Sequence, residues 1–232
     1  MQTTTNYTSG GKPIACEVFG PDSSANGGAI VIAYGSDGMI DNLHGQWATM
    51  LRGYATSLAE KGFISVIPDY FLRTGTAAGS IDYQHGGGQI VAMHRNDWAA
   101  ALNDAVTHLK TLAGVDPKRV GLLGFSLGGH LCLRVRSTAK VLVEFFAPLL
   151  DGIGTGGGPG LRAQIHHGTG DSLVPFESNA TPIEKELRSG GAATEVNDYR
   201  GAGHGFVGTD AANTSARSQS KAHTIAFFES NL

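Results

Sequence analysis

The sequence predicts an α/β fold with a mostly parallel, twisted sheet and helices on both faces. Short apolar runs alternate with amphipathic helical stretches along the 232 residues. The runs are rich in β-branched residues and stop near Gly or Pro, which is typical of strands buried on both faces. The residues of chemical interest follow the ends of such runs, where parallel sheets bind their ligands. No linker or internal repeat divides the chain, so we predict one domain over residues 1–232.

Six short apolar runs are the predicted buried strands. The run Ala29–Ala33 reads AIVIA and Gly35 follows it closely, whereas Phe63–Ile67 stops at Pro68. Runs this short and β-branched favour strands over helices. A further strand around Ile14–Phe19 is expected at an edge of the sheet. The other four runs are Val120–Phe125, Val141–Phe146, Ala163–His167 and Thr194–Tyr199.

Five stretches between the runs carry apolar residues at helical spacing. The first places Leu51, Tyr54 and Leu58 on one face, and Gly62 follows it, a favourable residue just past a helix end. Another is expected to begin at Pro182, because proline suits the first helical position. The five predicted helices are Trp47–Lys61, Ile90–Leu112, Leu127–Arg136, Pro182–Arg188 and Thr209–Asn231.

The composition excludes several classes of protein. Lys and Arg number 17 against 20 Asp and Glu, so the basic surface of a nucleic-acid-binding protein is absent. There is no run of about 18 apolar residues to predict a membrane-spanning helix, and the polar N-terminus shows no secretion signal. We therefore expect a cytoplasmic protein, a monomer or small homo-oligomer, that acts on a small molecule and binds neither nucleic acid nor membrane.

Neither a cofactor nor a metal ion is expected. Cys16 and Cys132 lie in apolar surroundings, which favours two buried free thiols over a disulfide. The side chains of Asp37, Asp41 and His44 are close in sequence, but they show no repeated ligand spacing. They therefore favour loop capping over a metal site.

The strongest motif is the segment Gly124–Gly128, which reads GFSLG and matches G-x-S-x-G. A predicted strand precedes it and a predicted helix follows, which is the setting of a nucleophilic serine on a sharp turn. The turn needs small residues two positions before and after Ser126, and both are glycine. We predict that Ser126 is a nucleophile. The alternative is a serine that only caps the helix after it.

A nucleophilic serine needs a base, and the base needs an acid that orients it. In this setting the chain order is Ser, then the acid, then His. Asp171 follows a predicted strand between Gly and Pro, whereas its competitor Asp151 lies in a Gly-rich loop. Two of the nine histidines follow both acids, and of these His223 falls in a helical stretch. We therefore predict a triad of Ser126, Asp171 and His204, the alternative for Asp171 being a turn cap.

This triad predicts acyl transfer in two steps. Ser126 attacks a carbonyl carbon, His204 takes and returns the proton, and Asp171 holds the His tautomer. Two backbone N–H groups are expected to bind the oxyanion. One belongs to Leu127 at the start of the helix, and the other comes from around Ser36, in the loop after the first buried strand.

Segments along most of the chain resemble the dienelactone hydrolase family of α/β-hydrolases. The resemblance implies a single α/β-hydrolase domain with a triad that cleaves esters or lactones. The segments are Ala33–Gly38, Ala59–Phe63, Pro68–Arg73, Gly121–Gly129, Gly170–Asp171 with Val174–Pro175, and Ala202–Phe206.

The chain also departs from the best-studied members of that family. They carry Cys where this chain has Ser126, and a Glu that assists the Cys where it has Gly35. The absence of both the Cys and the Glu is self-consistent, because a serine with an ordinary His–Asp pair does not need the Glu. Of two arginines that grip the substrate carboxylate in those members, Arg73 matches the first, and the second would fall near Gly208. The resemblance thus implies substrate binding by Arg73, the alternative being a solvated arginine, and favours a neutral or singly gripped ester or lactone.

Two other patterns indicate structure rather than chemistry. Gly152–Gly157 spells G-x-G-x-x-G, but Pro159 and a predicted strand follow where a dinucleotide-binding fold needs a helix. His166 and His167 are neighbours on a predicted strand, so their side chains point to opposite faces and cannot chelate together.

We predict a serine hydrolase that cleaves small carboxylic esters or lactones. The connection between Phe146 and Ala163 is about 16 residues long, too short for a cap domain, which favours small substrates. Two alternatives stay open. One is another acyl transfer on the same triad, by a peptidase, thioesterase or acyltransferase. The other is a binding protein without catalysis, which the filled triad positions disfavour.

Overall fold

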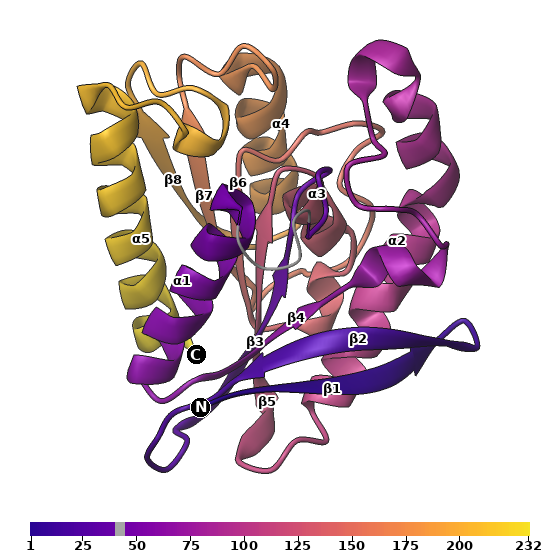
Figure 1. The fold of residues 1–232 in the computed structure, drawn as a ribbon. Helices are drawn as coiled ribbons and strands as arrows, with labels where there is room; N and C mark the ends of the chain where they lie inside the picture. Colours follow the sequence, from indigo (N-terminus) through magenta and orange to yellow (C-terminus); the bar gives the residue numbers. More distant parts are fainter. Residues whose placement is uncertain (40–44) are drawn as a thin grey trace. The chain divides into compact units, whose positions relative to one another are not determined.

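A computed structural model describes residues 1–39 and 45–232 of the protein (Figure 1). Asp41 and His44, considered above as metal ligands, lie outside the described residues. The described residues form two compact units, unit 1 (Met1–Val120) and unit 2 (Gly121–Leu232), and each is described by itself. The single domain over residues 1–232 stays a prediction.

Four strands lie wholly within unit 1: β1 (Gln2–Ser9), β2 (Lys12–Phe19), β3 (Gly27–Ala33) and β4 (Ile64–Pro68). They are arranged in the order β1-β2-β4-β3. The pairs β1–β2 and β2–β4 are antiparallel, whereas β3 and β4 are parallel. The sequence does not predict β1, because its segment QTTTNYTS is mostly polar and buries only Tyr7 and Ser9.

The long helices of unit 1 pack on opposite faces of its strands. They are α1 (Gln46–Glu60) and α2 (Gly87–Leu109). Glu17 of β2 forms an ion pair with Arg52 of α1 at 2.5 Å. Tyr7 donates its hydroxyl proton to the carbonyl of Ala101 in α2 at 2.9 Å. Tyr7 lies opposite Ile14 in the β1–β2 pairing, and Ile14 and Glu17 are three positions apart, so the two contacts are on different faces.

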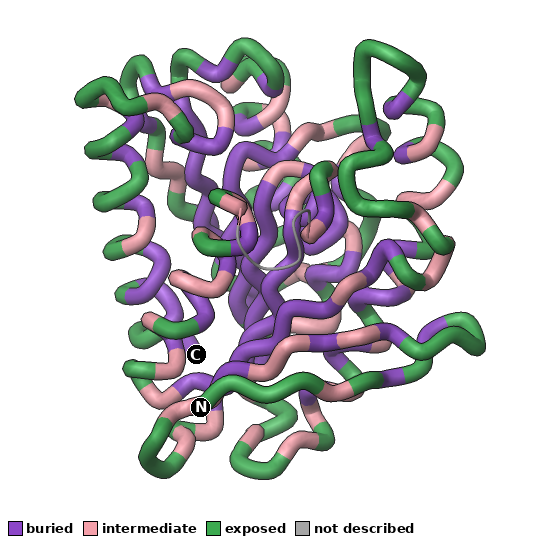
Figure 2. Tube along the Cα trace, in the orientation of Figure 1, coloured by how far each residue is buried: buried purple, intermediate pink, exposed green. Residues whose placement is uncertain are grey.

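Unit 2 is built on parallel strands in the order β5-β6-β7-β8. Their register aligns Phe125 with Phe145, and Phe145 with His166, so the strands end at one edge. Strands β6 and β7 are almost entirely buried, whereas β8 buries only Thr194 and Tyr199, and the outer sides of the helices are exposed (Figure 2). The bounds are β5 (Val115–Phe125), which begins within unit 1, β6 (Val141–Phe145), β7 (Arg162–Gly168) and β8 (Ala193–Tyr199).

Helices cover both faces of the unit 2 strands. The three α-helices are α3 (Leu127–Arg134), α4 (Phe176–Ser189) and α5 (Ala211–Asn231). On β7, the His166 ring reaches Thr224 of α5, with Nε2 and Oγ1 3.2 Å apart. The next side chain, His167, packs edge-on against Phe176 of α4, with ring centroids 5.5 Å apart. These contacts confirm the predicted parallel strands with helices on both faces, and the predicted opposite orientation of the two histidines.

Two helices begin clearly earlier than predicted: α2 at Gly87 instead of Ile90, and α4 by a larger margin. Helix α4 starts at Phe176, and Pro182, its predicted first residue, lies inside it. Proline is disfavoured in a helix interior because it lacks an N–H donor and its ring meets the preceding turn. Pro175 occupies the N-cap instead, so two prolines in this segment offer competing start signals.

Three other expectations concern a cap domain, the two cysteines and membrane-spanning helices. The connection from β6 to β7, residues 146–161, contains no helix or strand, so no large cap domain interrupts it. Cys16 and Cys132 are buried free cysteines, as predicted. Over residues 1–39 and 45–232, no helix is long and apolar enough to cross a membrane.

Candidate active site

Ser126 stands on the turn between β5 and α3. Its φ of 52° and ψ of −119° are a strained conformation for a residue with a side chain. Its N–H donates to the carbonyl of Phe145 on the next strand, at 2.9 Å. Gly124 permits the sharp turn, because a Cβ there would lie 2.4 Å from the carbonyl oxygen of Gly128. The GFSLG segment thus forms the predicted strand-to-helix turn, with the serine at its apex.

Asp171 lies in the acid loop (residues 169–175), which follows β7, and its side chain is fully buried. One carboxylate oxygen, Oδ1, accepts hydrogen bonds from the backbone N–H groups of Leu173 at 3.0 Å and Val174 at 2.8 Å. The other, Oδ2, lies 2.7 Å from Nδ1 of His204. The carboxylate is therefore held by backbone donors on one oxygen and by imidazole on the other.

His204 lies in the base loop (residues 200–206), which follows β8. Its Nε2 is 3.1 Å from Oγ of Ser126. Because a carboxylate only accepts hydrogen bonds, the proton of the neutral ring sits on Nδ1, and Nε2 accepts from the serine hydroxyl. Thr169 connects the acid loop to the base loop, because its Oγ1 accepts a hydrogen bond from the N–H of Gly201 at 2.9 Å. All three predicted triad residues are therefore brought into one hydrogen-bonded chain.

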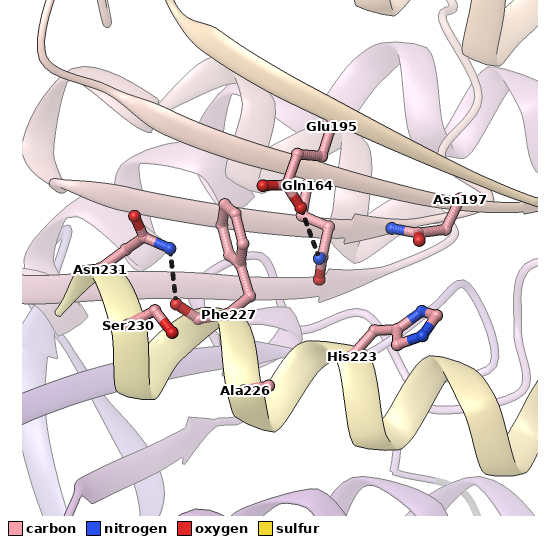
Figure 3. A pocket seen from close by; sticks show the side chains of 8 residues that line it. All are labelled: Gln164, Glu195, Asn197, His223, Ala226, Phe227, Ser230 and Asn231. Atoms are coloured by element: carbon pink, nitrogen blue, oxygen red, sulfur yellow. Dashed lines mark hydrogen bonds between the residues drawn. The ribbon is translucent and has the colours of Figure 1, made fainter.

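The competing acid and base lie elsewhere in unit 2. Asp151 is close to half exposed and forms an ion pair with Arg134 at 3.4 Å. His223 projects from α5, and its ring lies parallel to that of His166 with centroids 6.4 Å apart. It borders a hollow of about 370 Å³ between α5 and the strands β7 and β8 (Figure 3). The hollow is lined by Gln164, Glu195, Asn197, His223, Ala226, Phe227, Ser230 and Asn231.

The two predicted oxyanion donors belong to different units. Leu127 is the first residue of α3, so its N–H has no partner within the helix. Ser36 lies in unit 1, just after β3. The roles of Leu127 and Ser36 in binding an oxyanion stay predictions.

Arg73 lies in unit 1, at the end of the short helix η2 (Tyr70–Arg73). Its Nη1 donates to Oγ of Ser9 at 2.6 Å. Two carboxylates of α2 also face the guanidinium, Asp97 at 3.2 Å and Asp104 at 3.5 Å. These contacts connect β1 with α2, and the role of Arg73 in binding substrate stays a prediction.

Two residues beside the triad are not predicted from the sequence. Phe146, which follows β6 with a φ of 40°, packs edge-on against the ring of His204 at a centroid distance of 4.8 Å. His167 approaches Asp171, with Nε2 3.5 Å from Oδ2, and also contacts the carbonyl of Val174. The contact between His167 and Asp171 has one signal in the sequence, a histidine four positions before the predicted acid.

The chain of hydrogen bonds from Asp171 through His204 to Ser126 suits nucleophilic catalysis. A base within hydrogen-bond distance can take the serine proton as the oxygen attacks, and the buried carboxylate stabilises the imidazolium that forms.

Within the part of the chain that the structure describes, no three His, Cys, Asp or Glu side chains are grouped as metal ligands.

Solved structures with the same fold cover nearly the whole chain. The chain is 20% identical to a dienelactone hydrolase-like promiscuous phosphotriesterase from metagenomic libraries, with a TM-score of 0.77 over 100% of this chain and 98% of that chain. It is 19% identical to an esterase from Thermogutta terrifontis (TM-score 0.68, 97% and 93% covered). It is 16% identical to an α/β serine hydrolase without lid from Xanthomonas campestris (TM-score 0.68, 98% and 94% covered). These similarities establish the α/β-hydrolase fold.

Comparisons of sequence identify the family more directly. No curated protein matches the chain in sequence. The model of the dienelactone hydrolase family, however, matches residues 18–232. This match includes residues 18–120 of unit 1, all of unit 2 and every residue of the hydrogen-bonded chain described above. The protein therefore belongs to the dienelactone hydrolase family.

Proposed function

We propose that the protein is a serine hydrolase that cleaves small carboxylic esters or lactones through an acyl-enzyme. The observation that supports this proposal is the hydrogen-bonded chain Asp171–His204–Ser126, with distances of 2.7 and 3.1 Å. Family membership supports a hydrolase of the dienelactone hydrolase type. The strained backbone of Ser126 supports its role as the nucleophile, because strain of this kind is concentrated at functional sites.

In the proposed reaction, Oγ of Ser126 bonds to the carbonyl carbon while its proton passes to Nε2 of His204. Collapse of the tetrahedral intermediate breaks the bond to the alcohol oxygen, which leaves with that proton. Water then attacks the acyl-enzyme, with His204 again as the base, and the carboxylic acid is released. With a lactone the alcohol stays attached to the acyl chain, so the product is a hydroxy acid.

The segments that follow the strands of unit 2, together with the contacts of Arg73, support a neutral, partly apolar substrate. Three large aliphatic side chains of this unit are exposed, and each follows one of the strands β6, β7 and β8. Two of them, Leu173 and Val207, lie within three positions of Asp171 and His204 in the chain, and exposed apolar side chains beside a triad suit a partly apolar substrate. By contrast, Arg73 already faces two carboxylates, which favours an uncharged substrate over an anionic one. The three exposed side chains are Leu150, Leu173 and Val207.

Hydrolysis of p-nitrophenyl esters from acetate to octanoate, beside a dienelactone, tests the proposal. We expect turnover of the esters to exceed that of the dienelactone, with a preference for chains longer than acetate. Ser126→Ala should lower kcat by about 10⁴-fold or more. Ser215→Ala, at an exposed position on α5, is the matched control and should leave kcat unchanged. Full activity of the Ser126 variant, or no turnover of any ester, would contradict the proposal.

A further inference from the structure

His167 lies directly beside the acid of the triad. It is next to last in β7, and its side chain is completely buried. Its Nε2 is 2.7 Å from the carbonyl oxygen of Val174 and 3.5 Å from Oδ2 of Asp171. That carboxylate oxygen is the one that also faces Nδ1 of His204. Two imidazoles therefore approach the same oxygen of Asp171, and only one of them belongs to the triad.

The partners of the His167 ring determine where its proton lies. A carbonyl oxygen only accepts hydrogen bonds, so Nε2 must carry the proton that it shares with Val174. Burial lowers the pKa of His167, so the ring is neutral near neutral pH and Nδ1 has no proton. Among the described residues, Nδ1 has no hydrogen-bond partner. The ring therefore presents a single N–H, and that N–H faces the acid loop.

Val174 connects this N–H to the carboxylate. Its carbonyl accepts from His167 at 2.7 Å, while its own N–H donates to Oδ1 of Asp171 at 2.8 Å. A displacement of Val174 would thus disturb a donor to the carboxylate. We propose that His167 is a positioning residue, which fixes the acid loop through Val174 and places an N–H dipole beside Oδ2 of Asp171. This inference rests on the proposed function, because it assigns His167 a role only if Asp171 orients His204.

Packing alone does not account for a histidine at this position. A buried polar ring has a desolvation cost that an apolar side chain avoids, and here one ring nitrogen gains no hydrogen bond in return. Phe176 already supplies an apolar neighbour at 5.5 Å. The donated hydrogen bond is therefore the property that distinguishes histidine from an apolar residue at position 167.

The adjacent histidine provides a matched control. His166 is equally buried and on the same strand, but its side chain points to the opposite face. Its Nδ1 contacts the hydroxyl of Tyr199 and its Nε2 the side-chain oxygen of Gln164, both at 2.8 Å. Replacing His166 removes more hydrogen bonds than replacing His167, yet none of those bonds reaches Asp171.

The test compares three variants of the full chain. His167→Phe keeps a ring but removes the N–H, and His167→Gln keeps an N–H donor at the same number of bonds from Cβ. His166→Phe is the control. Each variant is measured by thermal unfolding, by kcat and KM for an ester that the wild type cleaves, and by the rate of Ser126 modification by a fluorophosphonate. In that modification the Oγ–P bond forms, fluoride leaves and the serine proton passes to His204.

We expect His167→Phe to lower kcat and the modification rate by about 10- to 100-fold, within the effect of removing an orienting partner, with KM changed less than threefold. His167→Gln should recover most of the loss. His166→Phe should lower the unfolding temperature at least as much but keep kcat within threefold. If His167→Phe does not fold, His167→Met, which also lacks an N–H, takes its place.

Two results would overturn the inference. One is a kcat for His167→Phe within threefold of wild type, and the other is a His167→Gln variant as impaired as His167→Phe. Failure of the proposed function looks different. In that case the wild type would cleave no ester, whereas the modification rate of Ser126 would still report on the effect of His167.

Discussion

Each unit of the molecule holds an aspartate just after a parallel strand, half-buried in unit 1 and buried in unit 2, and the two have different partners. In unit 1, Asp69 follows β4 and accepts a hydrogen bond from the hydroxyl of Tyr34 at 2.7 Å. That hydroxyl in turn accepts from the N–H of Phe71 at 2.9 Å. In unit 2, Asp171 faces His204, whose other ring nitrogen reaches Ser126. The first chain of hydrogen bonds ends at a backbone N–H, and the second ends at the hydroxyl of Ser126, the proposed nucleophile.

Asp69 and Asp171 occupy similar positions at strand ends, so the difference between them lies in the partner of each carboxylate. Burial raises the pKa of Asp69, and the hydrogen bond from Tyr34 acts against this by favouring the ionised form. A phenol has a single polar atom, its oxygen. Tyr34 therefore cannot accept a proton at one atom while it donates a hydrogen bond from a different atom. An imidazole has two nitrogens with different roles, which is what a relay between a carboxylate and a hydroxyl requires.

The largest expected difference between the two acids is in catalysis. Asp171→Asn should lower kcat by about 10³- to 10⁴-fold, because the amide no longer selects the His204 tautomer with its proton on Nδ1. Asp69→Asn should keep kcat within threefold, since its amide oxygen still accepts from Tyr34. Ester hydrolysis by both purified variants, each with a near-native circular dichroism spectrum, measures the difference. Equal losses of kcat would mean that the contrast between the two acids is wrong.

Another buried carboxyl of unit 2 extends the comparison from activity to stability. Glu144 on β6 is fully buried, and Oε2 accepts from the N–H of Ala147 at 2.9 Å. Burial raises its pKa to about 8, partly offset by that hydrogen bond. The folded state therefore retains a proton that the unfolded chain loses above its ordinary pKa of 4.5. The stability contribution is complete below that pH and is lost as the pH rises through about 8.

Urea unfolding between pH 5 and 8 measures this effect. The free energy of unfolding should fall with pH through Glu144, with a slope of at most about 1.4 kcal/mol per pH unit. Glu144→Gln should reduce the slope, because an amide does not titrate. Glu177→Gln, at an exposed position on α4, is the control and should keep the wild-type slope. An unchanged slope in Glu144→Gln would show that this carboxyl does not hold its proton in the fold.

Much of the fold follows from local sequence signals. Buried parallel strands are continuous apolar runs, so β3 to β7 are visible in the sequence. The mostly polar β1 is not, because its pairing with β2 depends on the hairpin rather than on an apolar pattern. Helix α4 begins earlier than predicted because Pro182 is tolerated inside it, and tertiary packing can override such a local preference.

The candidate site also contains residues that the sequence predicts and residues that it does not. Ser126, Asp171 and His204 could be predicted because a strand-to-helix turn and a fixed chain order restrict the choices. His167 and Phe146 could not, since their contacts depend on how the acid loop folds back and on a positive φ after β6. Residues that act through side-chain contacts of this kind leave little pattern in one sequence.

The most direct test of the central claim is the site of covalent modification by a fluorophosphonate. The protein is incubated with the reagent, its intact mass is measured, and the modified peptide is sequenced. We expect one adduct per chain, on Ser126. It should be absent in Ser126→Ala and form at least 100-fold more slowly in His204→Gln, because that variant lacks the base. An adduct on another residue, or equal rates in wild type and His204→Gln, would contradict an activated serine at this turn.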